Sequence, residues 1–483
     1  MSSAFLFFFS ECYHIFIFMR TFVSEITQKE GQKVTLMGWV SVRRDHGKLI
    51  FIDLRDMTGV CQAVFIGKEL HAQANQLRSE WVVQISGQVN KRPLAMVNKD
   101  IATGEYELAV ESLEILNEAT TPAFDLATDG YDVNEEVRMK YRYVDLRRPR
   151  LQKNIRNRDK IIALIRDFLH KYGFLEIETP ILTKSTPEGA RDYLVPSRVY
   201  PGTFYALPQS PQQYKQLLMT AGFERYFQIA RCFRDEDTRG DRQPEFTQLD
   251  MEMSFMSEEE IMHVTEALLI EIAQRLYPHK RIQQIPFPKI SYADAIAKYG
   301  SDRPDIREDK NDPNLLAFCW VVDFPFFEKI DGGGWTFTHN PFSGPRTEHL
   351  PWLMDKEKIE DIRAAQYDIV LNGLEIGGGS IRNHRPEALK KVFEIMGFAE
   401  ERIQKNFGHM LEALASGAPP HGGIAWGFDR LLMILENEPN IREVMAFPKT
   451  GDGQDPLMSA PSEVDQKQLS ELGLEIKKIK NKI

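Results

Sequence analysis

The chain has 483 residues, of which 42% are hydrophobic and 11% aromatic, and this composition excludes an intrinsically disordered chain. A chain of this length can bury a large core and should divide into about two or three domains. The formal net charge of −10 argues against a nucleic-acid partner unless Lys and Arg are gathered locally. Cys12, Cys61, Cys232 and Cys319 lie far apart with no Cys-x-x-Cys pair, which argues against a zinc site or a disulfide framework and indicates a reducing, cytoplasmic compartment.

Residues 1–18 form an unusual start to the chain. Their hydrophobic runs, 4–9 and 15–18, are too short to span a bilayer, and they lack a basic start and a small-residue cleavage site. We therefore interpret residues 1–18 as an appended hydrophobic extension and expect Met19 to be the functional start. We expect no membrane partner.

Residues 19–120 read as a small β-barrel domain. Five short stretches are rich in β-branched and aromatic residues and are separated by glycine turns: 34–42, 49–55, 60–65, 81–90 and 107–115. Five strands in so short a segment are typical of a Greek-key barrel of the oligonucleotide-binding (OB) type. Arg44 and His46 precede Phe51, an arrangement that suits stacking on an unpaired base. Taken alone, however, Phe51 is more simply a core residue.

Residues 121–155 read as a basic linker that leads into the next domain. Residues 138–160 contain ten Lys or Arg against Asp145 and Asp159, a local charge of +8. Such a run is usually a solvated face, but beside a nucleic-acid-binding barrel it also suits contact with phosphates. Both interpretations stay open at this point.

Residues 156–483 change to an α/β pattern. Apolar residues at helical spacing over 161–172 end at Gly173, and residues 174–180 then read as a strand closed by proline. Ser257 and Glu260 form a capping box at the start of another amphipathic helix. We expect an antiparallel sheet flanked by helices, and hence an α+β multidomain fold.

The most informative segment is a charged loop between two predicted strands. Residues 231–246 hold four arginines and five acids. Along the strand 246–255 side chains alternate, so Gln248 and Asp250 share one face while Leu249 and Met251 share the other. An antiparallel partner at 226–234 would bring Arg234 toward the polar face. Such a wall could hold a purine and its phosphates.

Several motifs in sequence order resemble class II aminoacyl-tRNA synthetases. The three class signatures correspond to the helix and strand ending at Pro180, to Phe233-Arg234-Asp235-Glu236 with Phe246, and to Gly427-Phe428-Asp429-Arg430. More narrowly, the segments 141–148, 186–193, 209–212 and 377–382 are similar to those of bacterial aspartyl-tRNA synthetases. The resemblance covers nearly everything from Met19 onward, and so many motifs in order make it specific.

The resemblance implies that L-aspartate reacts with ATP to give aspartyl-adenylate and pyrophosphate, after which the aspartyl group passes to the 3′ end of tRNA(Asp). Arg234 would hold the α-phosphate and the aspartate carboxylate, Arg430 would hold the γ-phosphate, and both act as catalytic residues through positioning and charge stabilisation. Phe246 would stack on adenine. The residues implied to bind ATP are Arg234, Asp235, Glu236, Gln243, Phe246, Glu375, Gly427, Phe428, Asp429 and Arg430. Asp368 and Glu375 would hold Mg²⁺ bridging the phosphates.

The resemblance also implies an aspartate site. Lys215 and Arg382 match a clamp for the side-chain carboxylate, which an asparagine enzyme would hardly need. The full set of implied aspartate ligands is Glu188, Gln212, Lys215, Arg234, Asp250, His339 and Arg382. Asn340 stands where relatives usually have a second histidine, which puts a charge-balancing role of that position in doubt.

Two further features concern tRNA. Arg44, His46, Phe51 and Gln62 match anticodon contacts, and histidine at position 46 is similar to family members that charge both tRNA(Asp) and tRNA(Asn). Bacterial relatives carry an inserted domain that would be missing here near residues 305–315. Because no matched catalytic residue falls within that insert, we expect activity to be retained.

Three alternative functions remain open, and so does the oligomeric state. A discriminating enzyme would charge tRNA(Asp) only. A tRNA-independent aspartate amide ligase should lack the barrel and the basic linker, and an inactive tRNA-binding paralogue should have lost residues such as Arg234 or Lys215; neither loss is seen. The resemblance to class II synthetases implies a homodimer formed through the helix and strand around residues 160–182, and the apolar stripe there is compatible with it.

Overall fold

The computed structural model describes residues 20–186 and 188–477. The chain divides after Asp125 into two compact units. The predicted extension at residues 1–18, the predicted start at Met19 and Cys12 lie outside the described residues, as does Pro187 of the segment 186–193. Within the described part of the chain, no helix has both the length and the apolar character needed to cross a membrane.

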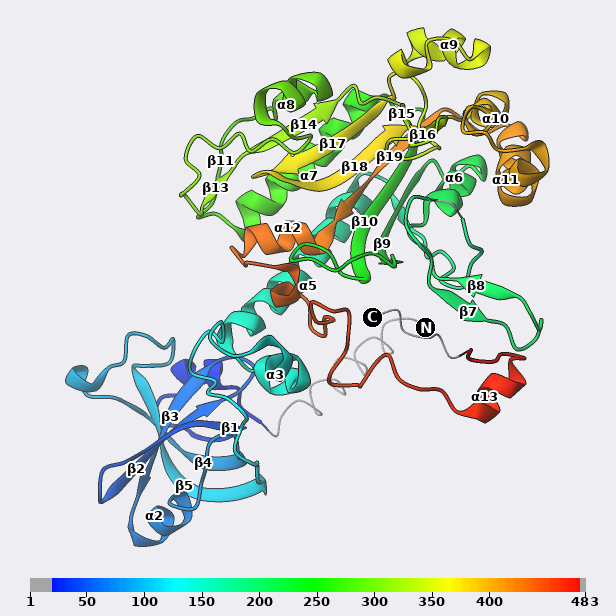
Figure 1. The fold of residues 1–483 in the computed structure, drawn as a ribbon. Coiled ribbons are helices and arrows are strands. Elements are labelled where there is room, and N and C mark those ends of the chain that lie inside the picture. Colours follow the sequence, from blue (N-terminus) through cyan, green and yellow to red (C-terminus); the bar gives the residue numbers. More distant parts are fainter. Residues whose placement is uncertain (1–19, 187, 478–483) are drawn as a thin grey trace, which may run out of the picture. The chain divides into compact units, whose positions relative to one another are not determined.

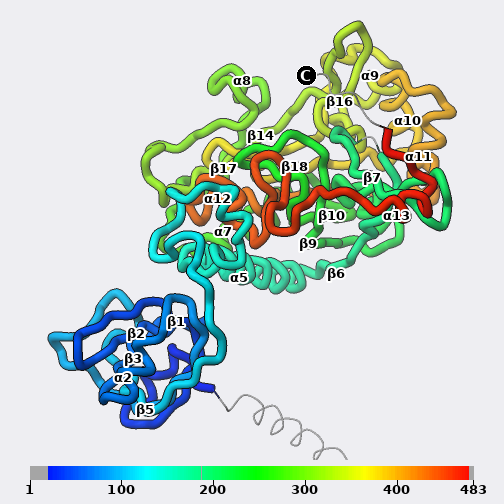
Figure 2. Tube along the Cα trace, turned by 60° about the horizontal axis from the view of Figure 1, so that its bottom comes forward, coloured from blue at the N-terminus to red at the C-terminus, as the bar shows by residue number. Residues whose placement is uncertain are grey.

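The first unit is a closed β-barrel (Figures 1 and 2). Its strands follow the order β1-β2-β3-β5-β4, with β3 and β5 parallel and the other neighbours antiparallel. Their bounds are β1 Lys33–Asp45, β2 Leu49–Arg55, β3 Val60–Ile66, β4 Val82–Lys91 and β5 Tyr106–Asn117. Each strand begins within about one residue of its predicted start, because alternating burial marks strands in a small barrel. The predicted OB-type barrel is confirmed.

Short helices complete this unit. They are η1 Val23–Gln28, α2 Lys68–Ala74 and η2 Leu94–Met96. Val23 and Ile26 of η1 and Ala74 of α2 are buried with the inward residues of the strands in one apolar cluster. The barrel therefore has its own hydrophobic core.

The second unit is built on an eight-stranded sheet of order β12-β14-β17-β18-β19-β10-β9-β6. Its central strands are antiparallel, and the two outermost pairs, β12–β14 and β6–β9, are parallel. The bounds are β6 Leu175–Glu176, β9 Arg225–Phe233, β10 Glu245–Ser254, β12 Lys289–Ser291, β14 Phe318–Val322, β17 Gln366–Leu371, β18 Leu374–Ile381 and β19 His421–Gly427. The expected α+β fold is confirmed.

Helices and short hairpins surround this sheet. The helices are α3 Glu135–Lys140, α4 Arg142–Asp145, α5 Pro149–Lys171, α6 Gln212–Thr220, α7 Glu258–Leu276, α8 Tyr292–Tyr299, η3 Thr347–His349, α9 Leu350–Asp355, η4 Ile359–Asp361, α10 Pro386–Ile395, α11 Glu400–Ala415, α12 Phe428–Leu435, η5 Ile441–Val444 and α13 Gln466–Glu471. The two-stranded pairs are β7 Leu194–Pro196 with β8 Phe204–Ala206, β11 Arg281–Ile282 with β13 Leu315–Leu316, and β15 Phe327–Lys329 with β16 Trp335–Phe337.

The predicted capping box at the start of α7 is present. The Ser257 hydroxyl accepts from the Glu260 N–H, and the Glu260 carboxylate accepts from the Ser257 N–H at 2.8 Å. These two bonds satisfy donors that the first turn would otherwise leave open.

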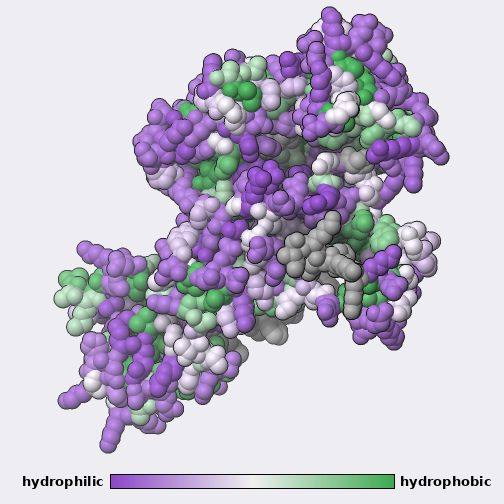
Figure 3. Space-filling view, viewed as in Figure 1, coloured by the Kyte–Doolittle hydropathy of each residue, from purple (hydrophilic) through white to green (hydrophobic). Residues whose placement is uncertain are grey.

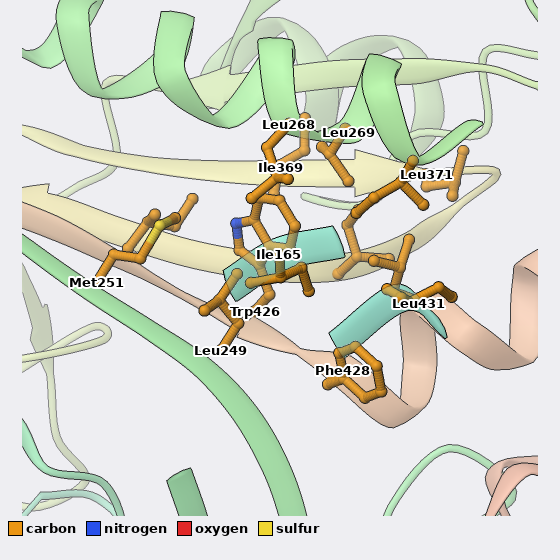
Figure 4. Close-up of a cluster of buried hydrophobic side chains, with 14 of the residues drawn as sticks. Ile165, Leu249, Met251, Leu268, Leu269, Ile369, Leu371, Trp426, Phe428 and Leu431 are labelled. Atoms are coloured by element: carbon orange, nitrogen blue, oxygen red, sulfur yellow. The ribbon is translucent and has the colours of Figure 1, made fainter. Parts of the chain in front are cut away.

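The main core lies on one face of the sheet (Figure 4). Leu249 and Met251 of β10 and Trp426 of β19 pack there with Ile165 of α5 and Leu268 of α7. Each such side chain contributes roughly 1.5–3 kcal/mol when buried. Because helices cover this face, the alternation along β10 leaves the opposite face free for polar groups. On the side of the second unit seen in Figure 3, hydrophilic residues predominate.

The predicted strand 174–180 is shorter than expected. Only Leu175 and Glu176 pair, in register with Tyr226 and Phe227 of β9, at the edge of the sheet. Proline at position 180 has no N–H to donate and fits only beyond such an edge.

The basic segment 138–160 is not a solvated face over most of its length. Arg138, Arg142 and Arg148 are buried, and all three donate to the buried carboxylate of Asp145, at 3.1, 2.8 and 2.7 Å. Arg138 also donates to Glu443 at 2.7 Å. These three arginines are therefore paired inside the second unit, whereas Lys140 and Lys160 of the same segment are exposed, and contact with phosphates stays a prediction.

Candidate active site

The polar face of the central sheet forms a cavity of about 320 Å³. It lies opposite the core because Gln248 and Asp250 point away from Leu249 and Met251, as the alternation along β10 predicts. The residues that line it and carry the argument below are Gln212, Lys215, Arg234, Glu236, Gln243, Phe246, Asp250, His339, Asp368, Glu375, Arg382 and Arg430. The fold thus brings together residues that are more than 200 positions apart in the sequence.

Two cations and one acid of the cavity lining form a buried cluster with a second acid that does not line the cavity. Lys215 of α6 lies 2.6 Å from Asp250 and 3.4 Å from Glu252, both on β10. Arg382, which follows β18, donates to Glu252 at 2.8 and 3.0 Å and to the Ser380 hydroxyl at 2.7 Å. The two predicted clamp cations therefore lie together, each already paired with an acid.

The charges within this cluster respond differently to burial. Burial raises the pKa of Asp250, although Lys215 opposes that shift. For Glu252, burial alone would raise the pKa, but Arg382 and Lys215 outweigh it and the pKa is lowered. Asp250 Oδ2 is buried and has no hydrogen-bond partner within residues 20–186 and 188–477. This oxygen could accept a hydrogen bond from a ligand in the cavity, for example from an ammonium group.

Glu252 is a site residue that the sequence prediction did not include. Its carboxylate reaches Arg382 only because Gly423 of β19 has no side chain: a Cβ there would lie 2.1 Å from Glu252 Oε2. The signal available in the sequence was its place on the polar face of the predicted strand, next to Asp250.

Arg234 and Arg430 also line the cavity. The Arg234 guanidinium lies 5.2 Å from the centre of the Phe246 ring. Arg430 donates to the Glu375 carbonyl and lies 3.1 Å from Asp241. The Nε atoms of Arg234 and Arg430 and Nε2 of Gln243 are buried and have no partner among the groups that the structure describes. All three residues line the same cavity, and guanidinium and amide groups in such a place suit the oxygens of an anion.

Two carboxylates converge near these donors, as predicted. A Cβ at Gly378 would lie 2.7 Å from Asp368 Oδ1 and 3.7 Å from Glu375 Oε1, so both acids lie close to this glycine. Burial, together with the neighbouring Glu375, raises the pKa of Asp368 well above its usual range. Uncompensated negative charge at oxygen donors suits a hard cation such as Mg²⁺. The described residues contain no group of three or more metal-binding side chains, so the other ligands would be phosphate or water oxygens.

Three of the residues predicted to bind aspartate or ATP do not line this cavity. Asp235 is half exposed and pairs with Arg191 at 3.5 Å. Glu188 accepts from Thr186 and from Ser210 and lines a second, neighbouring cavity. Phe428, predicted to bind ATP, is fully buried in the main core, because it begins α12 on the side that faces the helices.

Other predicted residues line the cavity but already have structural partners. Asp429 accepts from the Thr247 N–H at 2.8 Å and pairs with Arg158. His339 packs edge-on against Phe324, and burial lowers its pKa although Glu375 opposes the shift. Asn340 accepts from the Phe342 N–H at 2.7 Å, so its side chain shapes the loop.

The barrel carries the predicted anticodon residues on its outer face. Phe51 is half-buried between the buried Ile50 and Ile52, so it points away from the core. Arg44 lies opposite it in the register of β1 and β2 and donates two hydrogen bonds to Asp53, at 2.7 and 2.6 Å. This placement rules out Phe51 as a residue of the barrel core.

The neighbours of Phe51 on this face include the other two predicted contacts. The His46 ring lies 5.3 Å from the Phe51 ring. Gln62 donates to Glu107 at 2.9 Å, and Arg92 lies 3.7 Å from the same acid. Glu107 and Arg92 were not predicted, because sequence spacing does not show that β5 pairs with β3.

Comparisons with known proteins agree with this arrangement. Residues 34–116 match the OB-fold nucleic acid binding domain, and residues 134–451 match the class II tRNA synthetases (D, K and N). The chain is 41% identical to the aspartate–tRNA(Asp/Asn) ligase of Rubrobacter xylanophilus over 92% of its own length and 95% of that protein. It is 42% identical to the ligase of the same name from Geobacillus sp., over 95% and 98%.

The chain belongs to the aspartate–tRNA ligase family of class II synthetases.

Solved structures show the same fold. The asparaginyl-tRNA synthetase of Pyrococcus horikoshii, complexed with asparaginyl-adenylate, superimposes with a TM-score of 0.73 at 24% identity, over 90% of this chain and 98% of that one. A putative aspartyl-tRNA synthetase of Leishmania major Friedlin gives a TM-score of 0.72 at 21% identity, over 88% and 93%.

This aspartate–tRNA ligase family member is shorter than its relatives within the matched region. The alignment with the Rubrobacter protein spans 572 positions, whereas 92% of 483 residues is about 444, which leaves about 128 positions with no counterpart here. This difference supports the expected absence of an inserted domain; its location near residues 305–315 stays a prediction.

Proposed function

We propose that this chain activates L-aspartate with ATP and transfers the aspartyl group to tRNA(Asp) and to tRNA(Asn). The observation that carries the proposal is that Lys215, Arg382 and Asp250, whose two cations pair with the buried Glu252, line one cavity together with Arg234 and Arg430. A carboxylate clamp, an open acceptor for an ammonium group and an anion-binding end match an amino acid and a nucleoside triphosphate.

The clamp would set the amino-acid specificity. The side-chain carboxylate of aspartate would lie between Lys215 and Arg382, and its ammonium group would donate to Asp250 Oδ2. Asparagine offers no charge to these cations, and leaving buried charged groups without their partner is costly. The acids Asp250 and Glu252 keep the two cations in place when the site is empty.

The reaction itself would rest on positioning and charge stabilisation. The α-carboxylate attacks the α-phosphorus, and pyrophosphate leaves, so no protein nucleophile is required. Arg234 would hold the aspartate carboxylate and the α-phosphate together, with adenine on Phe246, and Arg430 would bind the γ-phosphate. Asp368 and Glu375 would hold Mg²⁺, which neutralises phosphate charge.

Loss of one clamp cation should affect aspartate far more than ATP. For Lys215→Met we expect kcat/KM for aspartate to fall by about 100-fold or more, because Asp250 and the ligand carboxylate both lose a buried cation. The measurement is ATP–pyrophosphate exchange at varied aspartate. The exposed Lys298→Met serves as the control; comparable losses in both variants would contradict the clamp.

The barrel face would bind the anticodon. For Phe51→Ala we expect tRNA(Asp) to bind about 5- to 100-fold more weakly, because one stacked base contributes roughly 1–3 kcal/mol. Exchange without tRNA should be unchanged. Met57, 59% exposed on the same barrel, gives the control Met57→Ala; equal weakening by both would show that Phe51 does not stack.

Two features support charging of both tRNAs. His46 lies beside Phe51 on the barrel face, and the relatives named above are Asp/Asn ligases. Steady-state charging of purified tRNA(Asp) and tRNA(Asn) with labelled aspartate tests this point. Comparable charging is expected; charging of tRNA(Asp) alone would establish a discriminating enzyme.

We also propose a cytoplasmic homodimer that assembles through α5, β6 and the segment that follows. Tyr172, Leu175, Ile181 and Leu182 are each more than 40% exposed there, which gives an apolar surface for a second copy. Light scattering should give twice the monomer mass of 55.7 kDa; the monomer mass would contradict the dimer. Cys61, Cys232 and Cys319 are buried free thiols, which suits a reducing compartment.

A further inference from the structure

A chain of three hydrogen bonds, two of them buried and the third partly buried, runs from the cavity into the protein. Gln212 Nε2 lies 3.1 Å from Gln216 Oε1, one turn further along α6. Gln216 Nε2 lies 3.1 Å from Nε2 of His421, and Nδ1 of His421 lies 2.8 Å from the carbonyl oxygen of Pro419. Gln216 and His421 are fully buried, and only Gln212 lines the cavity. The mechanism above uses neither of the two inner residues.

The last group in the chain fixes the direction of every bond. The carbonyl oxygen of Pro419 can only accept, so His421 Nδ1 carries the hydrogen. A neutral imidazole then accepts at Nε2, and Gln216 must present its NH₂ group there and its oxygen to Gln212. Burial lowers the pKa of His421, although Glu252 opposes that shift, so the neutral ring is favoured. Gln212 is therefore held by its NH₂ group.

We propose that Gln216 and His421 are positioning residues that orient the Gln212 amide, so that its Oε1 acceptor faces the ammonium group of the bound amino acid. The inference rests on the proposed function, because it deepens the description of the same aspartate site. If the chain were broken, the Gln212 amide could turn its NH₂ group toward the ammonium, and two donors would meet. An amide whose orientation is fixed before binding loses no freedom when the ligand arrives.

The same helix offers a matched comparison. Gln213 is also buried and also contacts a histidine, with 2.7 Å between its Oε1 and Nε2 of His409. That pair lines the second cavity and does not reach Gln212. If these buried glutamine–histidine pairs only stabilise the structure, substitution of Gln213 and of Gln216 should change KM for aspartate to a similar extent. If Gln216 positions Gln212, only substitution of Gln216 should change it.

The test compares Gln216→Met with Gln213→Met in ATP–pyrophosphate exchange, with aspartate and ATP varied separately. We expect Gln216→Met to raise KM for aspartate about tenfold, the usual effect of losing one hydrogen bond to a charged group, and to leave KM for ATP within about twofold. Gln213→Met should leave both values within about twofold. An unchanged KM for aspartate in Gln216→Met, or equal rises for both substrates, would overturn the proposal.

Two further variants keep the test decisive if Gln216→Met does not fold. His421→Leu breaks the chain from its inner end and should produce the same selective rise. Gln216→Glu keeps an acceptor for Gln212 and can pair with a protonated His421, so KM for aspartate should stay within about threefold of wild type. A selective rise in Gln216→Glu but none in His421→Leu would refute the chain. If wild type shows no aspartate-dependent exchange, the proposed function itself fails.

Discussion

Replacing Arg234 with alanine should reduce aspartate-dependent ATP–pyrophosphate exchange by about 1,000-fold, the effect typical of losing a preorganised donor at developing charge. Its guanidinium lies over Phe246, its buried Nε has no partner among the described residues, and it lines the same cavity as the clamp and the carboxylate pair. Among the cavity residues that the structure describes, Arg430 already donates to the Glu375 carbonyl and pairs with Asp241, and Arg242 lies 3.5 Å from Glu236. Binding of tRNA(Asp), measured by filter retention, should stay within about threefold of wild type, because the anticodon residues lie in the other unit.

Arg231 provides the matched control for this variant. It lies on the same strand, β9, but its side chain is 40% exposed and pairs with Glu245 at 3.0 Å. Such surface pairs contribute at most about 1 kcal/mol, so Arg231→Ala should retain exchange within about fivefold. Exchange that survives in Arg234→Ala, or that is lost equally in Arg231→Ala, would contradict the role given to Arg234.

Replacing Asp145 with asparagine should destabilise the second unit by about 3–5 kcal/mol, because three buried guanidiniums would lose their shared counter-charge. Arg138, Arg142 and Arg148 all donate to this carboxylate, whose side chain has no exposed surface. Scanning calorimetry should show the unfolding transition of this unit lowered by roughly 5–10 °C. The barrel has its own core and should unfold as in the wild type.

Asp159 is the control for that experiment. It lies in the same basic stretch, on α5, but is exposed. Asp159→Asn should shift the transition by less than about 1 °C, since isolated surface charges contribute little. Equal stability of Asp145→Asn and wild type would show that the arginines find other partners or remain hydrated.

Local pattern was enough to predict the parts of the fold in which side chains alternate. The barrel strands and the two faces of β10 follow directly from residues at every second position, and Gly173 with φ of 77° ends α5 where the pattern stops. The polar wall of the cavity was predicted for the same reason, because Gln248 and Asp250 had to lie opposite Leu249.

Local sequence patterns do not reveal contacts between residues that are far apart in the chain. In the sequence, the basic segment 138–160 has the character of an exposed surface. In the structure, Glu438 and Glu443, some 300 positions further along the chain, form ion pairs with its arginines. Phe428 belongs to a motif that suggests a ligand contact. At the start of α12, however, its side chain points into the hydrophobic core. Glu252 joins the site through Arg382, an interaction that neither residue shows in sequence.

Exchange of labelled pyrophosphate into ATP, measured on the wild-type chain with aspartate, asparagine and lysine in turn, tests the central claim most directly. The buried cations Lys215 and Arg382 predict exchange with aspartate and at least about 100-fold lower kcat/KM with asparagine or lysine. Exchange supported by asparagine or lysine and not by aspartate would contradict the account.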